Sequence, residues 1–237
     1  MTTHTPQTSP ADRPTIVLIH GLWGDAAHWG EVIAALGKRG HHKVRAVENP
    51  LTSLPDDAER TRKLVETIEE PVVLVGHSYG GEVITEMGDL PNVKALVYIS
   101  AWAPAKGQCA DDLCKAAPAP GLAAVSKDKF GYLWIEPSKF HAFFCQDVPE
   151  EKAHIMAVTQ KAPLAGLLQD RTTAAAWENK PSWYQLSTQD RMILPAQQRE
   201  FAERVKARRI LELPTSHAPM ATHPDAIAEL ILEAAQA

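Results

Sequence analysis

The stretch VVLVGHSYGGEVI, residues 72–84, constrains the fold of this chain more than any other part of its sequence. Its apolar run stops at Gly76, and a single hydroxyl, that of Ser78, lies between this glycine and Gly80. A sharp strand-to-helix turn requires such glycines, because side chains there would clash with the neighbouring strand and helix. The pattern therefore predicts a buried strand, a strained turn that exposes Ser78, and a helix. The simpler alternative is that Ser78 only caps that helix.

Short apolar runs recur along the chain and alternate with stretches of helical periodicity. Several runs are continuously apolar, which is typical of parallel strands that are buried on both faces. Such a β–α alternation predicts the α/β class, with an open, mostly parallel six-stranded sheet and helices on both faces. The predicted strands are residues 15–20, 42–48, 71–77, 93–101, 182–188 and 208–214.

Two of the predicted helices carry clear start signals. Asp25 is a plausible N-cap for a helix whose apolar positions, from Trp29 to Leu36, follow helical spacing. The last helix, with apolar residues at positions 227–234, is well opened by Pro224 as a first-turn residue.

Residues 104–166 break this alternation. Their prolines, aromatic residues and two nearby cysteines show no steady period, and the interval is too long for an ordinary connection in a compact domain. We therefore expect a cap or lid there, which we call the cap segment (residues 104–166). The predicted organisation is a flexible tail at 1–13, core residues 14–103, the cap segment, and core residues 167–237.

Composition limits the classes of binding partner and the cellular compartment that we expect for this chain. The chain has 237 residues, 45% of them hydrophobic and 22% charged, as in an ordinary globular domain. Its formal net charge of −5 argues against nucleic acid or an anionic membrane as the main partner. The first thirteen residues lack the features of a secretion signal, and the three cysteines fit neither a disulfide framework nor a zinc site. We expect a cytoplasmic protein with a small-molecule partner and no metal or cofactor; homodimer formation is left open.

A serine hydroxyl is a poor nucleophile, so Ser78 needs a base, and that base needs an orienting acid. The predicted fold places both in loops that follow later strands, the acid before the histidine. Asp190 follows the run YQLST, and His217 follows the last run, LELP, within a short loop. Ser78, Asp190 and His217 are therefore the predicted catalytic residues. Asp190 alone would also fit a turn or helix cap, and Asp170 and Glu178 are the next candidates for the acid.

The predicted reaction also needs two backbone N–H groups that stabilise the negative charge on the substrate oxygen. One is expected from Tyr79, which follows the nucleophile at a helix N-terminus. The other is expected from Leu22 in the loop after the first strand, where Gly21 allows the backbone to approach closely.

Taken together, these segments resemble the α/β-hydrolase superfamily, and more narrowly its branch of plant methylesterases, plant hydroxynitrile lyases and many bacterial esterases. The resemblance is carried by VLIHGLWGDAAHW, ENPLTSLPDD, PVVLVGHSYGGEVI, ALVYISAWAP, DRMILPAQQ and SHAPMATHPDAIAE, and covers nearly everything from Pro14 on. It implies the same triad and oxyanion donors, and a cap from Pro104 onward. The lyases most often carry threonine at the position of Gly21 and lysine at that of Ala218, so the resemblance disfavours lyase chemistry.

The leading hypothesis is a serine hydrolase that cleaves small carboxylic esters through an acyl-enzyme. One alternative keeps the fold but changes the reaction to that of a lactonase, amidase, perhydrolase or hydroxynitrile lyase. Another is a non-catalytic receptor that holds a small molecule under the cap. Large apolar side chains are candidates for the substrate pocket, with core packing as the competing role; they are Trp23, Trp102, Trp134, Phe144 and Met192.

Overall fold

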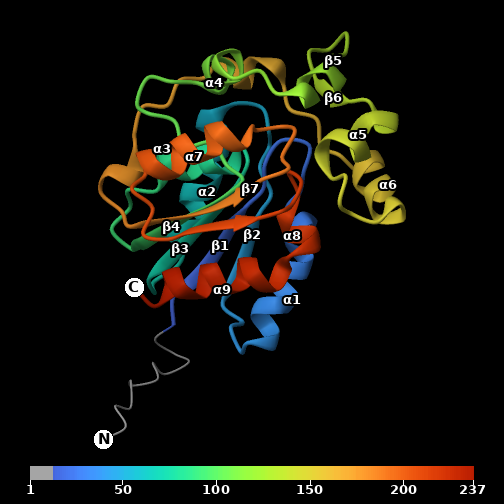
Figure 1. Ribbon diagram of the computed structural model, residues 1–237. Helices are drawn as coiled ribbons and strands as arrows, with labels where there is room; N and C mark the ends of the chain where they lie inside the picture. Colours follow the sequence, from blue (N-terminus) through green and yellow to red (C-terminus); the bar gives the residue numbers. More distant parts are fainter. Residues whose placement is uncertain (1–12) are drawn as a thin grey trace, which may run out of the picture.

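Six parallel strands form one sheet in the computed structural model, which describes residues 13–237 (Figure 1). The strand order is β2-β1-β3-β4-β7-β8, and every neighbouring pair is parallel. This confirms the predicted α/β class and all six predicted strands. The strands are β1 (Thr15–Ile19), β2 (Val44–Val47), β3 (Val72–His77), β4 (Val93–Ile99), β7 (Ser182–Ser187) and β8 (Ile210–Leu213).

The inner strands are buried and the edge strands are not. Every residue of β1, β3 and β7 is buried, whereas β2 and β8 are partly exposed along their length. Helices cover both faces of the inner strands, so their side chains meet no water on either side. This explains why the inner strands are the most apolar runs of the sequence.

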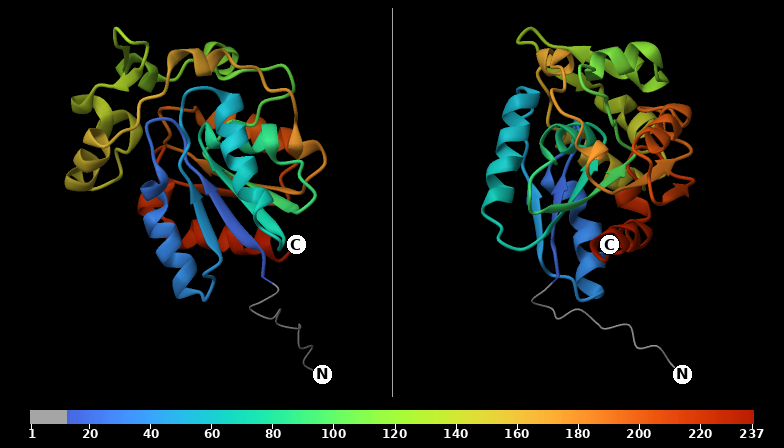
Figure 2. Two further views of the ribbon diagram at one scale, coloured as in Figure 1. Left: turned by 180° about the vertical axis from the view of Figure 1, so that it is seen from behind. Right: turned by 90° about the vertical axis from the view of Figure 1, so that its left-hand side faces the viewer.

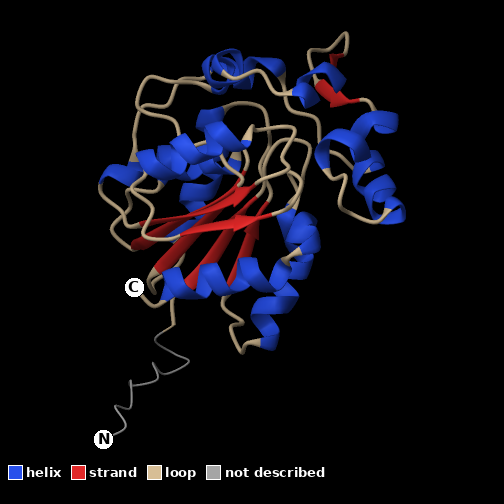
Figure 3. Ribbon diagram, in the orientation of Figure 1, coloured by secondary structure: helices blue, strands red, loops and turns tan. Residues whose placement is uncertain are grey.

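Helices lie on both faces of the sheet, as Figures 1 and 2 show. One face is covered by α1 (Gly30–Lys38), α8 (Pro219–Thr222) and α9 (Pro224–Ala235). The opposite face is covered by α2 (Leu54–Glu66), α3 (Gly80–Met87) and α7 (Pro195–Arg204). The sheet is thus the middle of three layers, which Figure 3 shows by element type.

The predicted helix starts are present. The Asp25 side chain accepts hydrogen bonds from the N–H groups of Ala27 and His28 and caps η2 (Ala26–Trp29), a short 3₁₀ turn that runs into α1. Pro224 is the first residue of α9, whose apolar positions are buried against the sheet. Asp25 thus fixes the start of η2, and Pro224 favours the start of α9 as a first-turn residue.

The cap segment lies between β4 and β7 and contains regular structure that the sequence pattern does not reveal. Helices α5 and α6 and the small antiparallel pair β5–β6 project to one side of the sheet, at the right of Figure 1. The cap segment contains α4 (Ala110–Ala116), η3 (Pro120–Ala124), β5 (Val125–Lys127), β6 (Leu133–Ile135), α5 (Pro137–Phe144) and α6 (Glu150–Val158). Two further 3₁₀ turns, η4 (Ala165–Gln169) and η5 (Ala176–Glu178), lead back to β7. The boundaries of the cap segment, at residues 104 and 166, stay a prediction.

Except for Arg13, the predicted N-terminal tail lies outside the described residues. Within residues 13–237, no helix is both long enough and apolar enough to cross a membrane. The three cysteines, Cys109, Cys114 and Cys145, are free thiols.

Candidate active site

Ser78 lies at the turn between β3 and α3, and its backbone is strained. Its φ of 54° is in the left-handed region, which residues with a side chain rarely adopt. A Cβ atom added to Gly76 or Gly80 would lie 2.4 Å from a backbone oxygen, that of Gly80 or Ile19 respectively. Only glycine fits at these positions, which is the physical reason for the spacing noted in the sequence.

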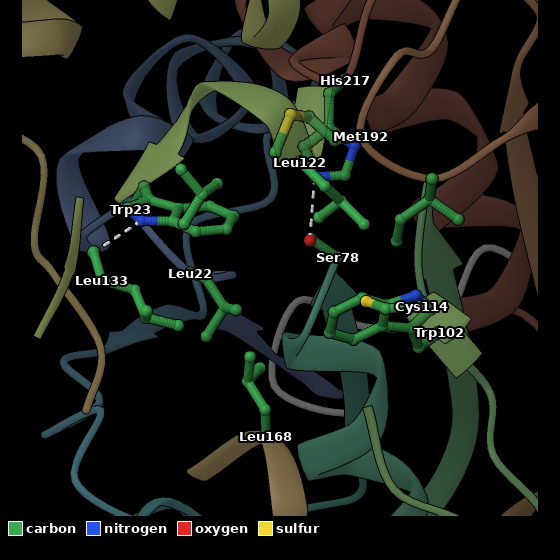
Figure 4. A pocket seen from close by; sticks show the side chains of 12 residues that line it. Leu22, Trp23, Ser78, Trp102, Cys114, Leu122, Leu133, Leu168, Met192 and His217 are labelled. Atoms are coloured by element: carbon green, nitrogen blue, oxygen red, sulfur yellow. Dashed lines mark hydrogen bonds between the residues drawn. The ribbon is translucent and has the colours of Figure 1, made fainter. Parts of the chain in front are cut away.

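The structure brings Ser78, His217 and Asp190 together from three separate loops. The Ser78 hydroxyl lies 2.8 Å from His217 Nε2 (Figure 4), and His217 Nδ1 lies 2.7 Å from Asp190 Oδ2. The three residues are at most 4% exposed. Since Nδ1–H donates to the carboxylate, Nε2 is free to accept the serine proton, which is the arrangement required of a general base.

Both oxygens of Asp190 accept hydrogen bonds. Oδ1 accepts from the backbone N–H groups of Met192 (2.7 Å) and Ile193 (3.0 Å). Oδ2 accepts from Gln198 Nε2 at 2.8 Å in addition to His217. These donors hold the carboxylate in one orientation toward the imidazole. Asp170, an alternative acid, instead accepts the Leu54 N–H at 2.8 Å.

A second histidine holds the backbone of His217 and was not singled out by the sequence. His77 Nε2 donates to the His217 carbonyl oxygen over 2.7 Å. Complete burial, with a further contribution from the charge of His217, lowers the pKa of His77 well below its usual value. His77 is therefore a neutral donor. Its position next to Ser78 in the sequence gave no sign of this contact, which spans 140 residues.

The loop of the first predicted oxyanion donor, Leu22, packs directly on Ser78. A Cβ atom at Gly21 would lie 2.5 Å from the Ser78 Cβ atom. Buried His20 fixes this loop, because its Nδ1–H donates to the Gly21 carbonyl and its Nε2 accepts the Asn49 N–H. Burial lowers the pKa of His20, in keeping with this neutral form. Within residues 13–237, the Leu22 N–H donates to no protein acceptor.

The second predicted oxyanion donor, Tyr79, is anchored by its side chain. The phenol donates to Asp57 Oδ2 over 2.8 Å, and Asp57 Oδ1 accepts the Leu51 N–H at 2.9 Å. Burial raises the pKa of Asp57 to about 6, although both hydrogen bonds oppose this shift. The Tyr79 N–H also has no protein acceptor among the described residues.

An apolar cavity opens onto Ser78 and His217, as Figure 4 shows. It encloses about 400 Å³, including space that is open to solvent. Trp23, Trp102 and Met192 line it, as expected from the sequence. The remaining lining residues are Leu22, Cys114, Leu122, Val125, Leu133, Leu168 and Ile193. Aside from the side chains of Ser78 and His217 and the Cys114 thiol, the wall offers little that is polar.

Two expected pocket residues do not line this cavity. Trp134 is 40% exposed and donates to Asp128, because successive residues of a strand point to opposite sides and its neighbour Leu133 takes the inner position. Phe144 is buried behind the site, where its ring lies at 85° to the His217 imidazole with the centroids 5.0 Å apart. It therefore contacts the predicted base rather than the cavity.

Within residues 13–237, no three His, Cys, Asp or Glu side chains are grouped closely enough to hold a metal ion.

Known proteins resemble this chain, one of them over nearly its whole length and another over about three fifths of it. A probable hydrolase, R7, from Phoma sp. is 24% identical over 94% of this chain and 98% of its own. A carbendazim hydrolyzing esterase from Nocardioides sp. is 29% identical over 60% of this chain and 62% of its own.

Solved structures share the fold. The pyrethroid hydrolase PytH has a TM-score of 0.81 at 22% identity, covering 94% of this chain and 98% of its own. Polyneuridine aldehyde esterase has a TM-score of 0.80 at 19% identity, covering 93% and 98%. The sequence model of the alpha/beta hydrolase family matches residues 16–230, and this chain belongs to that family.

Proposed function

We propose that this chain is a serine hydrolase that cleaves small, uncharged carboxylic esters, with Ser78 as nucleophile, His217 as base and Asp190 as orienting acid. The observation that carries the proposal is the continuous hydrogen-bonded path from the Ser78 hydroxyl through His217 to Asp190, with distances of 2.8 and 2.7 Å. A path of this kind activates a hydroxyl that is otherwise unreactive.

The proposed reaction has two halves. The Ser78 oxygen attacks the ester carbonyl carbon while His217 Nε2 takes the hydroxyl proton. The N–H groups of Leu22 and Tyr79 stabilise the oxyanion, and His217 then protonates the departing alcohol, which leaves an acyl group on Ser78. A water molecule, deprotonated by His217, then attacks the acyl carbon, and His217 returns the proton to the Ser78 oxygen as the bond to the acyl group breaks and the acid leaves.

The apolar wall of the cavity supports uncharged esters as the substrate class. A charged group near the reacting carbonyl would lose its hydration against Leu122, Leu133 and Leu168 and gain no partner from them. A cap segment of about sixty residues can close one pocket but not build a long tunnel, which favours compact acyl and alcohol groups. Names of relatives agree with this class, since one is a carbendazim hydrolyzing esterase and another a polyneuridine aldehyde esterase.

A substrate panel tests the proposal against its alternatives. The purified protein is offered p-nitrophenyl esters from acetate to palmitate, together with lactones, amides, peracid formation from hydrogen peroxide, and a cyanohydrin. We expect the highest kcat/KM on acetate or butyrate, and no turnover of the cyanohydrin because Ala218 supplies no ammonium for cyanide. Ser78→Ala serves as the control and should lower ester turnover by about 10⁴-fold or more.

Several outcomes would contradict the proposal. If a lactone or amide were the preferred substrate, the proposed ester hydrolysis would be wrong. A maximum of kcat/KM at dodecanoate or longer would contradict the proposal that the substrates are compact. Tight binding of a small molecule without turnover would favour the receptor alternative.

A further inference from the structure

One short piece of the cap segment contacts both loops that carry the proposed acid and base. Residues 142–147 comprise the end of α5 and the start of its connection to α6. Asp190 lies in the loop after β7, and His217 lies in the loop after β8. We call this piece, whose sequence is AFFCQD, the 142–147 segment; of its residues, the sequence analysis singled out only Phe144, and as a pocket residue.

On the acid side, the 142–147 segment is bonded to the two residues that flank Asp190. The Arg191 guanidinium donates to the Ala142 carbonyl oxygen over 2.7 Å. The Gln146 side-chain amide donates to the Gln189 carbonyl oxygen, also over 2.7 Å. The loop is therefore attached to the cap segment immediately before and after the carboxylate.

On the base side, the same segment supports the loop of His217. Asp147 Oδ2 accepts the N–H of Ser216, the residue before His217, at 3.1 Å, and the Thr222 hydroxyl at 3.2 Å. Phe144 meets the imidazole edge to face, with the ring centroids 5.0 Å apart. Phe140 stacks on Phe144 at 4.7 Å and restricts its movement.

Two polar side-chain atoms of the 142–147 segment, Asp147 Oδ1 and Gln146 Oε1, are buried without a hydrogen-bond partner among the described residues. Buried polar groups are normally paired, and exceptions concentrate at functional sites.

We propose that Asp147 and Phe144 are positioning residues that hold the His217 imidazole against Ser78, an inference that rests on the proposed function. Asp147 fixes the backbone immediately before His217. Phe144 covers one side of the imidazole, which limits its rotation and keeps water from that side. The cap segment thus builds part of the catalytic geometry as well as the pocket wall.

The test compares four variants by kcat, KM, pH profile and melting temperature on p-nitrophenyl acetate. Asp147→Ala should lower kcat about 10- to 100-fold with KM nearly unchanged, the size expected when a reacting group is displaced by about 1 Å. Asp147→Asn keeps an acceptor for the Ser216 N–H and should restore most of kcat. Glu150→Gln is the matched control, because it removes an exposed carboxylate of the same cap segment.

Phe144→Leu tests the second residue through the pH profile. Asp190 and His77 also face the imidazole and are unchanged in this variant. Water admitted to the exposed side of the ring favours the charged imidazolium. The acidic limb of the kcat/KM profile should therefore move to higher pH, by a few tenths of a unit.

Retention of wild-type kcat and an unchanged acidic limb in Asp147→Ala and Phe144→Leu would overturn the inference, even if both variants melted at lower temperature. The rate at which a fluorophosphonate labels Ser78, followed by mass spectrometry, separates this result from a failure of the proposed function. A chain that labels rapidly but cleaves no ester would disprove the ester assignment. The labelling rates of the variants would then decide the positioning role.

Discussion

The strand ends of the sheet and the cap segment both border the cavity, but they differ in how tightly they are built. At the strand ends, a Cβ atom on Gly80 would lie 2.4 Å from a backbone oxygen. At the end of the cap segment, in η4, a Cβ atom on Gly166 would meet nothing within 4 Å, although Gly121 in η3 packs closely on Arg191 and Met192. The cap segment also exposes large apolar side chains, with Phe130 72% and Val158 60% exposed.

The strand ends and the cap segment therefore have different tasks. The strand ends hold Ser78, Asp190 and His217, and the proposed reaction is sensitive to displacements of about 1 Å there. Apart from the 142–147 segment, the cap segment supplies apolar walls such as Leu122 and Leu133, whose demands are shape and size. We therefore expect substitutions at the strand ends to affect kcat and folding, and substitutions in the cap wall to affect the choice of substrate.

The largest effect is expected from Asp190→Asn. The amide keeps its size but would pair with the wrong imidazole tautomer, so kcat should fall by about 10⁴-fold at neutral pH with little change in KM. Kinetics on p-nitrophenyl acetate measure this. Near-normal turnover would show that the acid lies elsewhere, and Asp170 and Glu178 would be tested next.

The second prediction compares two glycines directly. Gly80→Ala should destabilise the protein by about 3 kcal/mol, because the methyl group overlaps backbone that cannot move away. Gly166→Ala should change the free energy of unfolding by less than about 0.5 kcal/mol. Urea unfolding measures the free energy of unfolding of both variants. Equal values would show that the two regions do not differ in how tightly they are packed.

A smaller effect is expected from Leu122→Ala in the cap wall. The added space should shift the preferred p-nitrophenyl ester from acetate or butyrate toward longer chains, by about 10-fold in relative kcat/KM. Turnover of acetate itself should stay close to wild type. Val158→Ala, an exposed position in the same cap segment, is the control, and an identical profile for both variants would argue against a wall role for Leu122.

The smallest effect concerns the buried Glu82 in α3, whose two carboxyl oxygens have no hydrogen-bond partner among the described residues. Burial, with the charges of Asp170 and Glu86, raises its pKa well above 4.5. The folded state thus holds the proton more tightly, and the unfolding free energy falls as pH rises above 4.5. Glu82→Gln should match wild type near pH 4 and melt a few degrees higher at pH 8. A difference in melting temperature between Glu82→Gln and wild type that stayed the same from pH 4 to pH 8 would contradict this prediction.

Much of the candidate site was predictable because its signals are local. The Gly-x-Ser-x-Gly spacing is a demand of the turn itself, and Asp190 and His217 follow strands that could be recognised from their apolar runs. Trp134 and Phe144 were misplaced because aromatic character indicates burial or contact but not direction. Their directions depend on strand alternation in β6 and on the packing of α5.

The sequence by itself determined the parallel sheet, the strand-to-helix turn at Ser78 and the order of the predicted acid and base. Neighbouring residues are enough to dictate strands, turns and helix starts. Only the tertiary structure decided which residues support them. His77 meets the His217 backbone across 140 positions, and Asp147 meets Ser216 across 69. Contacts between such distant residues leave no periodicity or spacing in one sequence, because they form only when the strands and the cap segment have packed together.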